Sequence, residues 1–366
     1  MARSKRILIS GYYGFSNAGD EAVLSAIIGG LRAQADDIEI AVLSASPEET
    51  AGAHKVSALP RASISHVTKA LSGCDLLISG GGSLIQDATS FRSLAYYLAI
   101  IALAKHYRRK VMVLGQGIGP LRRCISRRLA RAVLDKVDLI TVRDPQSAGL
   151  LTELGVSRPP IRITADPTLL LEPCQSEEAI RLLSGIGLSA DDDLIAVSLR
   201  RWRTRGIEKA AAEALAALAE KLPAKLLLLT MHTPEDVILA RQVQEAINLP
   251  GRVIIQPGPW AAGQLLGVLG KCRLVVAMRL HALIFAAAAG APSVGIAYDP
   301  KVEHFLAATG QESVSLAETA SGMLAERVML AWEARDSLAS QLAETIPPMR
   351  DAAAENIKLA LELLSS

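Results

Sequence analysis

The sequence predicts an α/β protein made of two domains, each built around a parallel sheet. Its 366 residues are enough for two domains at roughly 150 residues each. Hydrophobic residues make up 50% of the chain but aromatic residues only 4%, so aliphatic side chains must fill the core, as in buried parallel strands. Short aliphatic runs also alternate with stretches of helical period, which is typical of βαβ units.

In the first half of the chain, the aliphatic runs predict six strands with helices between them. The expected strands are 6–10, 38–43, 75–79, 111–114, 139–142 and 161–164, and the expected helices are 20–34, 91–107, 123–136 and 145–154.

The second half repeats this alternation after a proline-containing stretch, which we interpret as a linker at 167–177. The expected strands are 194–199, 225–230, 253–256, 274–277 and 293–297, and the expected helices are 208–221, 234–246, 261–269, 280–289, 302–308, 316–335 and 339–364. We therefore expect Rossmann-like domains at 1–170 and 178–338. A C-terminal helix at 339–366 could pack back on the first domain or meet another subunit.

Charge and cysteine usage exclude several classes of protein. The net charge of +2 is too small for the overall basic field of a nucleic-acid-binding protein. Cys74, Cys124, Cys174 and Cys272 are far apart and form no CxxC pair, so we expect reduced thiols and no metal site.

The sequence also favours a cytoplasmic protein. The glycines of 11–14 interrupt the first apolar stretch too early for a signal peptide, and the longest uncharged apolar run, 94–104, is shorter than the ~20 residues of a membrane span.

Ligands of open parallel sheets bind beyond the carboxyl ends of the strands, and two Rossmann-like domains in tandem usually face each other across a ligand cleft. Functional residues should therefore directly follow strands. This rule directs attention to three glycine-rich loops and to a small set of cations.

The first glycine-rich loop, 11–21, follows the first strand. It has neither the Gly-Lys-Ser/Thr end of a P-loop nor the spacing of GxGxxG. Its glycines would let the backbone approach a ligand, and Asn17 or Asp20 could cap the next helix. A tight turn with a helix cap is the alternative interpretation. The candidate site residues here are Gly11, Tyr13, Asn17, Gly19 and Asp20.

Two further loops, 79–87 and 115–120, repeat the order strand, glycines, helix. At 79–87, close approach of a ligand or of the facing domain would explain the glycines, and close packing of helix on strand is the alternative. The three glycine-rich loops together would form a smooth floor of backbone at one edge of the sheet. The candidates are Gly80, Gly81, Gly82, Gln86, Gln116 and Gly117.

Three cations and one histidine also follow strands. Arg143 could bind a carboxylate or phosphate through its fork of donors, or form a structural ion pair with Asp144 or Asp166. Arg279 and His281 lie where the strand 274–277 passes into a helix, and Lys301 follows the next strand. Together these groups indicate a ligand with two or more negative charges.

Two more basic clusters are ambiguous. Arg200 and Arg201 begin a run of four arginines, 200–205, that could bind a second phosphate or a diphosphate, or could be a solvated loop. Arg123, Arg127 and Arg131 are spaced along one helix face that could contact an anionic membrane surface, although an ordinary solvated face is the simpler interpretation.

These segments together resemble the polysaccharide pyruvyltransferase family, and in particular its bacterial cell-wall type. The matching segments run in the family's order and cover most of the chain: Gly11–Glu21, Ser79–Asp87, Gly115–Pro120, Thr141–Asp144, Met278–His281 and Tyr298–Lys301. The last 60 or so residues carry no motif.

The resemblance implies two facing Rossmann-like domains, similar to GT-B glycosyltransferases, and phosphoenolpyruvate as the donor. The family's donor-binding residues fall on Arg143, Arg279, Leu280, His281 and Lys301, with Arg279 and His281 also catalytic. It further implies that a cyclic 4,6-ketal forms on an N-acetylmannosamine residue linked to a polyprenyl diphosphate. Such a residue belongs to a secondary cell-wall polymer of the kind that anchors an S-layer. No cofactor or metal is implied.

We interpret His281 as the acid that protonates the donor's methylene carbon, while the arginines neutralise its charges. One alternative is a GT-B glycosyltransferase with a nucleotide-sugar donor, since the fold alone does not decide function. Another is a binding or sensor module without turnover. The acceptor, the oligomeric state and a peripheral association with the inner face of the membrane are not fixed by the sequence.

Overall fold

The computed structural model describes residues 4–202 and 206–366. Contacts between Cα atoms divide the chain into two compact units. The first unit extends to Leu171 and also includes Met349–Ser366, whereas the second unit comprises Glu172–Pro348. Each unit has its own parallel sheet and its own core.

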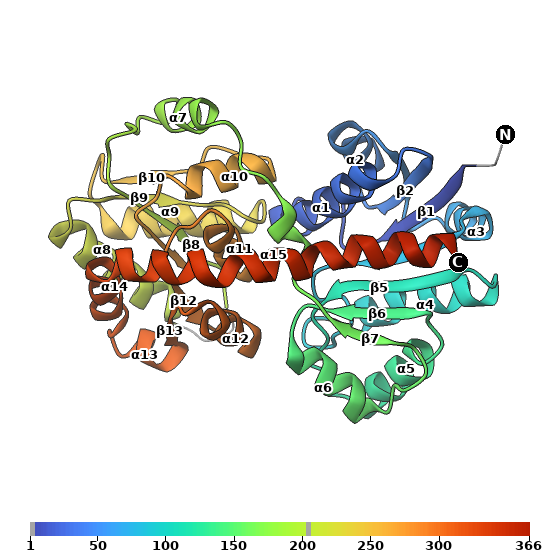
Figure 1. The fold of residues 1–366 in the computed structure, drawn as a ribbon. Helices are drawn as coiled ribbons and strands as arrows, with labels where there is room; N and C mark the ends of the chain where they lie inside the picture. Colours follow the sequence, from blue (N-terminus) through green and yellow to red (C-terminus); the bar gives the residue numbers. More distant parts are fainter. Residues whose placement is uncertain (1–3, 203–205) are drawn as a thin grey trace. The chain divides into compact units, whose positions relative to one another are not determined.

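The first unit contains a seven-stranded parallel sheet in the order β3-β2-β1-β4-β5-β6-β7 (Figure 1). The strand order reverses between β1 and β4, so the loops after these two strands leave toward opposite faces of the sheet. The strands are β1 (Lys5–Ser10), β2 (Ile38–Ser44), β3 (Ser57–Pro60), β4 (Leu76–Gly80), β5 (Lys110–Gln116), β6 (Leu139–Val142) and β7 (Ile161–Ile163).

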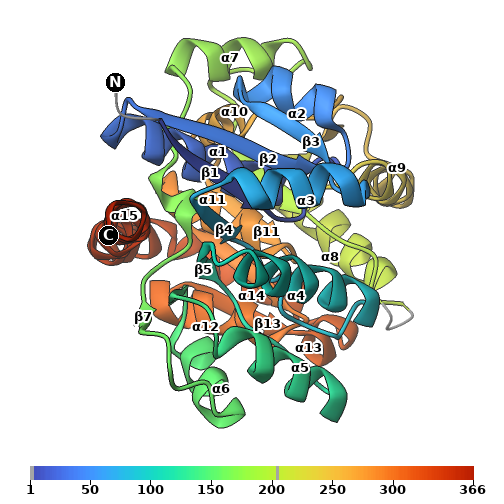
Figure 2. The same cartoon turned by 90° about the vertical axis from the view of Figure 1, so that its right-hand side faces the viewer.

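Helices cover both faces of this sheet, as buried parallel strands require. One apolar cluster joins the sheet to α1 and the end of α15, and another joins it to α3, α4, α5 and α6. Figure 2 shows α15 on one side of the sheet and α3, α4 and α5 on the other. The helices are α1 (Ala18–Gln34), α2 (Pro47–His54), α3 (Ile64–Gly73), α4 (Phe91–His106), α5 (Cys124–Leu134), α6 (Pro145–Leu154) and the 3-10 helix η1 (Pro167–Leu170).

The second unit has a six-stranded parallel sheet in the order β10-β9-β8-β11-β12-β13. Its order reverses between β8 and β11, so it repeats the topology of the first unit. The strands are β8 (Leu194–Ser198), β9 (Lys225–Leu228), β10 (Val253–Ile255), β11 (Leu274–Ala277), β12 (Ser293–Ala297) and β13 (Glu312–Ser315).

The helices of the second unit follow the predicted alternation with two differences. A helix at Ser176–Ser184 was not predicted, and it begins within the linker expected at 167–177. The helix expected at 316–335 is wrong, because Gly322 adopts a positive φ of 86° and separates two shorter helices. The helices are α7 (Ser176–Ser184), α8 (Ile207–Lys221), α9 (Glu235–Ile247), α10 (Ala262–Leu269), α11 (Leu280–Ala288), α12 (Pro300–Thr309), α13 (Leu316–Ala320) and α14 (Leu324–Glu333).

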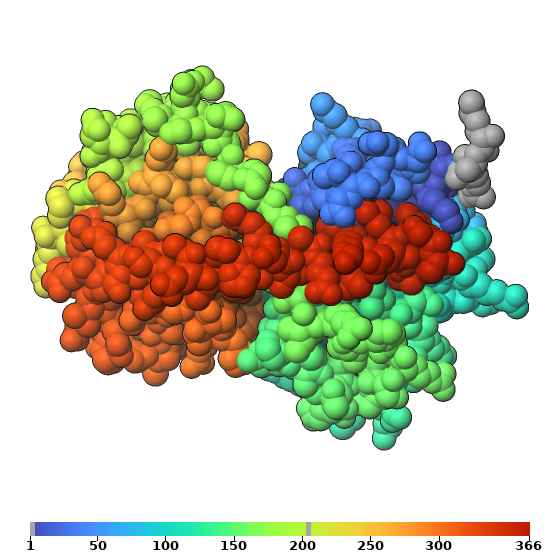
Figure 3. All heavy atoms as spheres, in the orientation of Figure 1, coloured from blue at the N-terminus to red at the C-terminus, as the bar shows by residue number. Residues whose placement is uncertain are grey.

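The last helix, α15 (Arg335–Ser365), starts four residues earlier than the sequence predicts, and its residues from Met349 onward belong to the first unit. Figure 3 shows this end of the helix, in red, lying against the surface of that unit. Asn356 is fully buried there. Its Oδ1 accepts hydrogen bonds from Thr141 Oγ1 (2.6 Å) and Thr164 Oγ1 (2.9 Å), and its Nδ2 donates to the Ala165 carbonyl (3.0 Å). One amide thus ties the helix to the carboxyl ends of β6 and β7.

We expect Asn356→Ala to destabilise the first unit by about 2–4 kcal/mol, because these three buried hydrogen bonds and a fourth, from Nδ2 to the Ala353 carbonyl (3.0 Å), are lost while their partners stay buried. Urea unfolding measures this loss. Lys358→Ala is the matched control on the same helix, since the Lys358 side chain is 70% exposed. Equal stability of both variants would mean that Asn356 does not anchor α15.

Candidate functional site

The predicted site residues directly follow strands in both units. In the first unit they follow β1, β4 and β6 or span the end of β5, and in the second they follow β8, β11 and β12. The strands β1 and β4, like β8 and β11, flank the reversal of strand order. This reversal is where open α/β sheets bind their ligands.

The first loop of the first unit is held by its own side chains. Asn17, not Asp20, is the N-cap of α1, and its Oδ1 accepts a hydrogen bond from the Gly19 amide (3.1 Å). Tyr13 is buried and donates its hydroxyl proton to the Gly80 carbonyl (3.2 Å). Burial, with Asp20 and Glu21 nearby, raises the pKa of Tyr13 well above its usual value. Tyr13 is therefore a neutral core residue that links the loops after β1 and β4.

Packing inside the unit accounts for most glycines in these loops. A Cβ on Gly11 would lie 2.3 Å from Tyr13 Cζ, and one on Gly80 would lie 2.9 Å from Tyr13 Oη. Gly81 has a φ of 52°, and its Cβ would overlap with Val23 of α1. The contact of Gly81 with α1 supports close helix-on-strand packing as the reason for the glycines of 79–87, and the contact of Gly11 with Tyr13 fits the tight turn considered for 11–21. Gly82 has a φ of 67°, which itself favours glycine, and a Cβ there would lie 3.0 Å from the Asp20 carboxylate.

The two predicted glutamines form hydrogen bonds within and between the loops and strands of the first unit. Gln116 is fully buried and donates from Nε2 to the Ser79 carbonyl (2.9 Å) and to Ser79 Oγ (3.0 Å). Gln86 Oε1 accepts the Thr89 amide (3.1 Å) and closes a turn. Gln116 thus cross-links β5 to β4 beneath the loops and is not exposed to a ligand.

Arg143 lies in an internal ion pair. Its Nη1 donates to Asp166 Oδ2 (2.7 Å) and its Nη2 donates to Ser83 Oγ (3.1 Å). The side chains of Arg143 and Asp166 are only 6% and 4% exposed. Gly117 lies against this guanidinium, since a Cβ there would be 2.9 Å from Arg143 Nη2. The structural ion pair named as the alternative is therefore present, and an anionic ligand would have to compete with Asp166.

In the second unit, Arg279 forms a similar pair with a residue that the sequence analysis did not identify. Arg279 is the N-cap of α11, and its Nη2 donates to Asp236 Oδ1. Their side chains are 14% and 3% exposed. The other oxygen of Asp236 accepts the amides of Met231 and His232, both at 3.0 Å. Asp236 is thus a fixed anion that orients Arg279.

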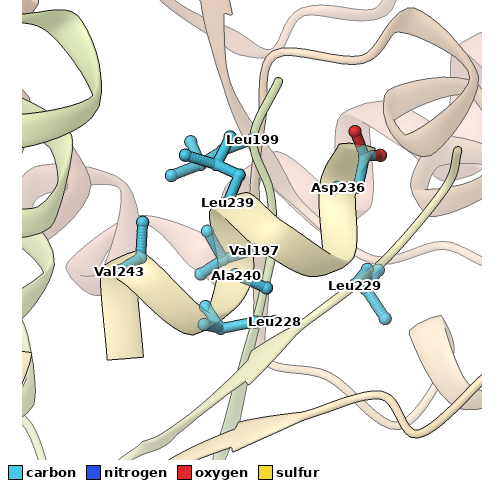
Figure 4. A pocket seen from close by; sticks show the side chains of 8 residues that line it. All are labelled: Val197, Leu199, Leu228, Leu229, Asp236, Leu239, Ala240 and Val243. Atoms are coloured by element: carbon cyan, nitrogen blue, oxygen red, sulfur yellow. The ribbon is translucent and has the colours of Figure 1, made fainter. Parts of the chain in front are cut away.

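The position of Asp236 could have been inferred from its acidic character in the first turn of the helix after β9. Figure 4 shows it at that turn, where it is the one polar residue among eight that line a small internal gap. The gap measures about 10 Å³, so it is a packing defect and not a substrate pocket.

Arg279, Leu280 and His281 together form the start of α11. Leu280 is buried, and His281 is partly buried in the first turn, with its ring centroid 6.2 Å from that of Phe285. The amino end of a helix favours an anion through its unpaired amides. Arg279 Nε is buried and makes no hydrogen bond to any residue of 4–202 or 206–366, so it can serve as a donor to an anion.

Arg200 is held by two aromatic rings. Its Nη1 donates to the Tyr298 hydroxyl (2.9 Å), and its guanidinium lies 5.2 Å from the Trp202 ring centroid and 5.0 Å from that of Tyr298. Its Nε is also buried without a partner among the described residues. Arg200 follows β8 and Tyr298 follows β12, so this contact spans the carboxyl edge of the sheet on both sides of β11.

The other predicted cations are more exposed. Arg201 donates to Gln242 Oε1 at the surface (2.9 Å), and Arg203 and Arg205 lie outside the described residues. Lys301 is 30% exposed, and its Nζ is 3.6 Å from Asp299 Oδ2. Asp299 also caps α12 by accepting the Lys301 amide (3.1 Å). Arg200, Arg279 and Lys301 thus follow three adjacent strands of one sheet.

The described residues contain no cluster of three or more His, Cys, Asp or Glu side chains with the geometry of a metal site. None of their helices is both long enough and apolar enough to span a bilayer. All four cysteines are free thiols.

Solved structures with the same architecture share little sequence with the chain. One is a putative UDP-N-acetylglucosamine 2-epimerase from Listeria monocytogenes, with a TM-score of 0.70, 13% identity and coverage of 99% of this chain and 96% of that one. Another is a glycosyltransferase from Rickettsia africae, with a TM-score of 0.65, 10% identity and full coverage of both chains. A third is HepE from Anabaena in complex with UDP, with a TM-score of 0.67, 13% identity and 99% coverage of both. At these identities the likeness shows the GT-B-like fold alone.

A family comparison is more specific. The family model described as "Polysaccharide pyruvyl transferase" matches residues 17–300, which is most of the chain and includes Arg143, Arg200, Asp236, Arg279 and His281. The chain therefore belongs to the polysaccharide pyruvyl transferase family.

Proposed function

We propose that this protein transfers the pyruvyl group of phosphoenolpyruvate to a sugar of a cell-surface glycan precursor. The observation that carries the proposal is the family match, which extends across Arg279 and His281 at the reversal of strand order in the second unit. The family accounts for pyruvyl transfer, and the charges of the site support the choice of donor.

Phosphoenolpyruvate carries a carboxylate and a phosphate, so its site needs several cations. Arg200, Arg279 and Lys301 follow adjacent strands, and the Nε atoms of both arginines are buried donors with no acceptor in the described part of the chain. A buried unpaired donor on a charged group is costly. Oxygens of a bound anion would satisfy these donors.

Arg279 is positioned for this role by Asp236. Because Asp236 is itself held by two backbone amides, the guanidinium plane of Arg279 is fixed before a ligand binds. A fork of donors in a fixed plane suits a carboxylate or phosphate better than a flexible ammonium does. Lys301, which is more exposed, would supply a further positive charge.

His281 is our choice for the general acid. It would protonate the methylene carbon of phosphoenolpyruvate, leaving an oxocarbenium-like centre at the adjacent carbon. A sugar hydroxyl attacks this carbon and loses its proton, inorganic phosphate leaves, and a second hydroxyl of the same sugar closes the cyclic ketal. Imidazole suits this proton transfer near neutral pH. The arginines offset the donor's charge, and no metal is invoked.

For the acceptor, we propose an N-acetylmannosamine residue on a polyprenyl-diphosphate carrier, modified as a 4,6-ketal in the cytoplasm. The solvent-exposed Arg201 could contact the diphosphate of such a carrier. The glycine-rich loops of the first unit are the proposed acceptor region.

One competing function has a specific observation in its favour. HepE of Anabaena, which has the same fold, has been solved in complex with UDP. A nucleotide-sugar donor would place a diphosphate on the same arginines. The assay below distinguishes the two functions, because only pyruvyl transfer adds a ketal and releases inorganic phosphate.

We expect His281→Ala to lower turnover by about 10²–10⁴-fold, as loss of a general acid does. The assay combines phosphoenolpyruvate with N-acetylmannosaminides that carry an apolar aglycone, in the presence of EDTA, and follows the ketal by mass spectrometry and phosphate by colorimetry. His66→Ala, on the exposed surface of α3, is the control. Near-normal turnover of His281→Ala would exclude the acid role.

We expect Asp236→Asn to lower kcat/KM for phosphoenolpyruvate at least about tenfold. Asparagine can still accept a hydrogen bond from a backbone amide, but it carries no negative charge to pair with Arg279. Steady-state kinetics measures this loss. Glu235→Gln, one residue earlier on the same turn, is the control, because Glu235 is 60% exposed and pairs with His232 instead. Tighter donor binding with unchanged kcat would show that Asp236 merely offsets charge.

A further inference from the structure

We propose that the outward face of α5 docks on an anionic phospholipid surface. This proposal goes beyond the proposed function, because it concerns a surface that carries no candidate catalytic residue and it can be tested without donor or acceptor.

The face combines exposed apolar and basic side chains. Ile125 is 50% exposed and Leu129, one turn later, is 37% exposed. Arg128 and Ala132 are also exposed and lie on the same side of the helix by its period. An aliphatic pair with a cation between its members is typical of helices that lie in the interfacial layer of a membrane.

The exposure of this face follows from how firmly the opposite face is packed. Ala130 and Leu134 are buried in the apolar cluster of α4, α6 and the sheet. Asp87 accepts the amides of Arg122 (2.8 Å) and Arg123 (2.9 Å) just before the helix begins. Burial would raise the pKa of Asp87, but these amides and Ser126 outweigh it and hold the pKa below its usual value. The helix is therefore fixed, and Ile125 and Leu129 point outward because of the packing.

The structure revises which arginines face outward. Of the arginines that the sequence singled out, Arg127 turns sideways to pair with Glu153 (2.6 Å), whereas Arg123 and Arg131 are exposed. Arg131 lies over the end of α6, where a Cβ on Gly155 would be 3.2 Å from its Cζ. Arg122 and Arg128 are exposed, and neither has a carboxylate within ion-pair distance among residues 4–202 and 206–366. Their charges are thus available to an anionic partner.

A basic hollow continues this face at the end of the helix. Its lining consists of Arg128, Arg131, Ala132, Asp135, Lys136 and Arg158. The one carboxylate, Asp135, is turned toward the amides of Ser157 (2.8 Å) and Arg158 (3.0 Å), which hold its pKa below the usual value. Asp135 also pairs with Arg158 (Oδ2 to Nε, 3.3 Å), so Arg128, Arg131 and Lys136 are the cations of the hollow that suit a lipid phosphate.

The apolar pair is what favours a lipid surface over a nucleic acid. Phosphate backbones are bound by cations and polar groups, and exposed aliphatic side chains add nothing to such contacts. In an interfacial layer, Ile125 and Leu129 would leave water while arginine side chains reach the phosphates. Nucleic-acid binding is an outcome of the test below.

The test is flotation of the full-length protein with vesicles of phosphatidylcholine alone or with phosphatidylglycerol. We expect binding to the anionic vesicles only. Each arginine contributes about fivefold near an anionic surface, so Arg122→Gln/Arg128→Gln/Arg131→Gln should weaken binding roughly a hundredfold. Ile125→Ser/Leu129→Ser should weaken it at least about tenfold, since both variants keep the buried face of α5 intact.

The matched control is Ile64→Ser/Lys69→Gln on α3, which removes an 81% exposed isoleucine and an exposed lysine from another helix of the same unit. It should bind as the original protein does. Circular dichroism verifies that all variants are folded. No binding of the original protein to anionic vesicles, or equal weakening by the α3 control, would overturn the proposal.

A second readout locates the contact. Cys124 at the start of α5 is exposed, whereas Cys74 and Cys272 are buried, so a polarity-sensitive fluorophore in a Cys174→Ala background reports on α5. Anionic vesicles should shift its emission to the blue. An unchanged emission spectrum of vesicle-bound protein would overturn the assignment to α5. The assignment would also be overturned if single-stranded DNA abolished vesicle binding while Ile125→Ser/Leu129→Ser left vesicle binding intact.

Discussion

The candidate site depends on a topological constraint that both sheets share. Crossover connections between parallel strands are right-handed, so a sheet that grows first in one direction and then in the other leaves two neighbouring loops on opposite faces. This reversal occurs between β1 and β4 and again between β8 and β11. Every candidate cation of the second unit follows β8, β11 or β12, next to or one strand beyond that reversal.

A second shared feature is an arginine that follows a strand and pairs with a deeply buried aspartate. Arg143 pairs with Asp166 in the first unit and Arg279 pairs with Asp236 in the second. Burying such charges is costly, and the cost is offset only when both partners have further hydrogen bonds. Asp166 also accepts the Thr168 amide and hydroxyl, and Asp236 accepts two amides. The two pairs differ in their arginines. The buried Nε of Arg279 has no acceptor among the described residues, whereas the Arg143 side chain is only 6% exposed.

Most of the fold could be predicted because buried parallel strands are continuous aliphatic runs. The strands 139–142, 274–277 and 293–297 have the predicted bounds. The short strand β3 and the strand β13 were missed, since Ser57–Pro60 and Glu312–Ser315 are edge strands with few aliphatic residues. The predicted placement of cations after strands is confirmed for Arg143, Arg279 and Lys301. The acidic first turn of α9 marks the position of Asp236, but its pairing with Arg279 was missed, because the two residues are 43 positions apart in the sequence. The need for glycine at position 81 could likewise not be derived from the local sequence, since it depends on packing against Val23 of α1.

The most direct test of the central claim is isothermal titration calorimetry of donor binding. We expect phosphoenolpyruvate to bind to one site per chain and Arg279→Gln to weaken this binding at least about tenfold, while UDP-N-acetylglucosamine gives no heat. Saturable binding of the nucleotide sugar, with no heat from phosphoenolpyruvate, would contradict the account and identify a nucleotide-sugar enzyme instead.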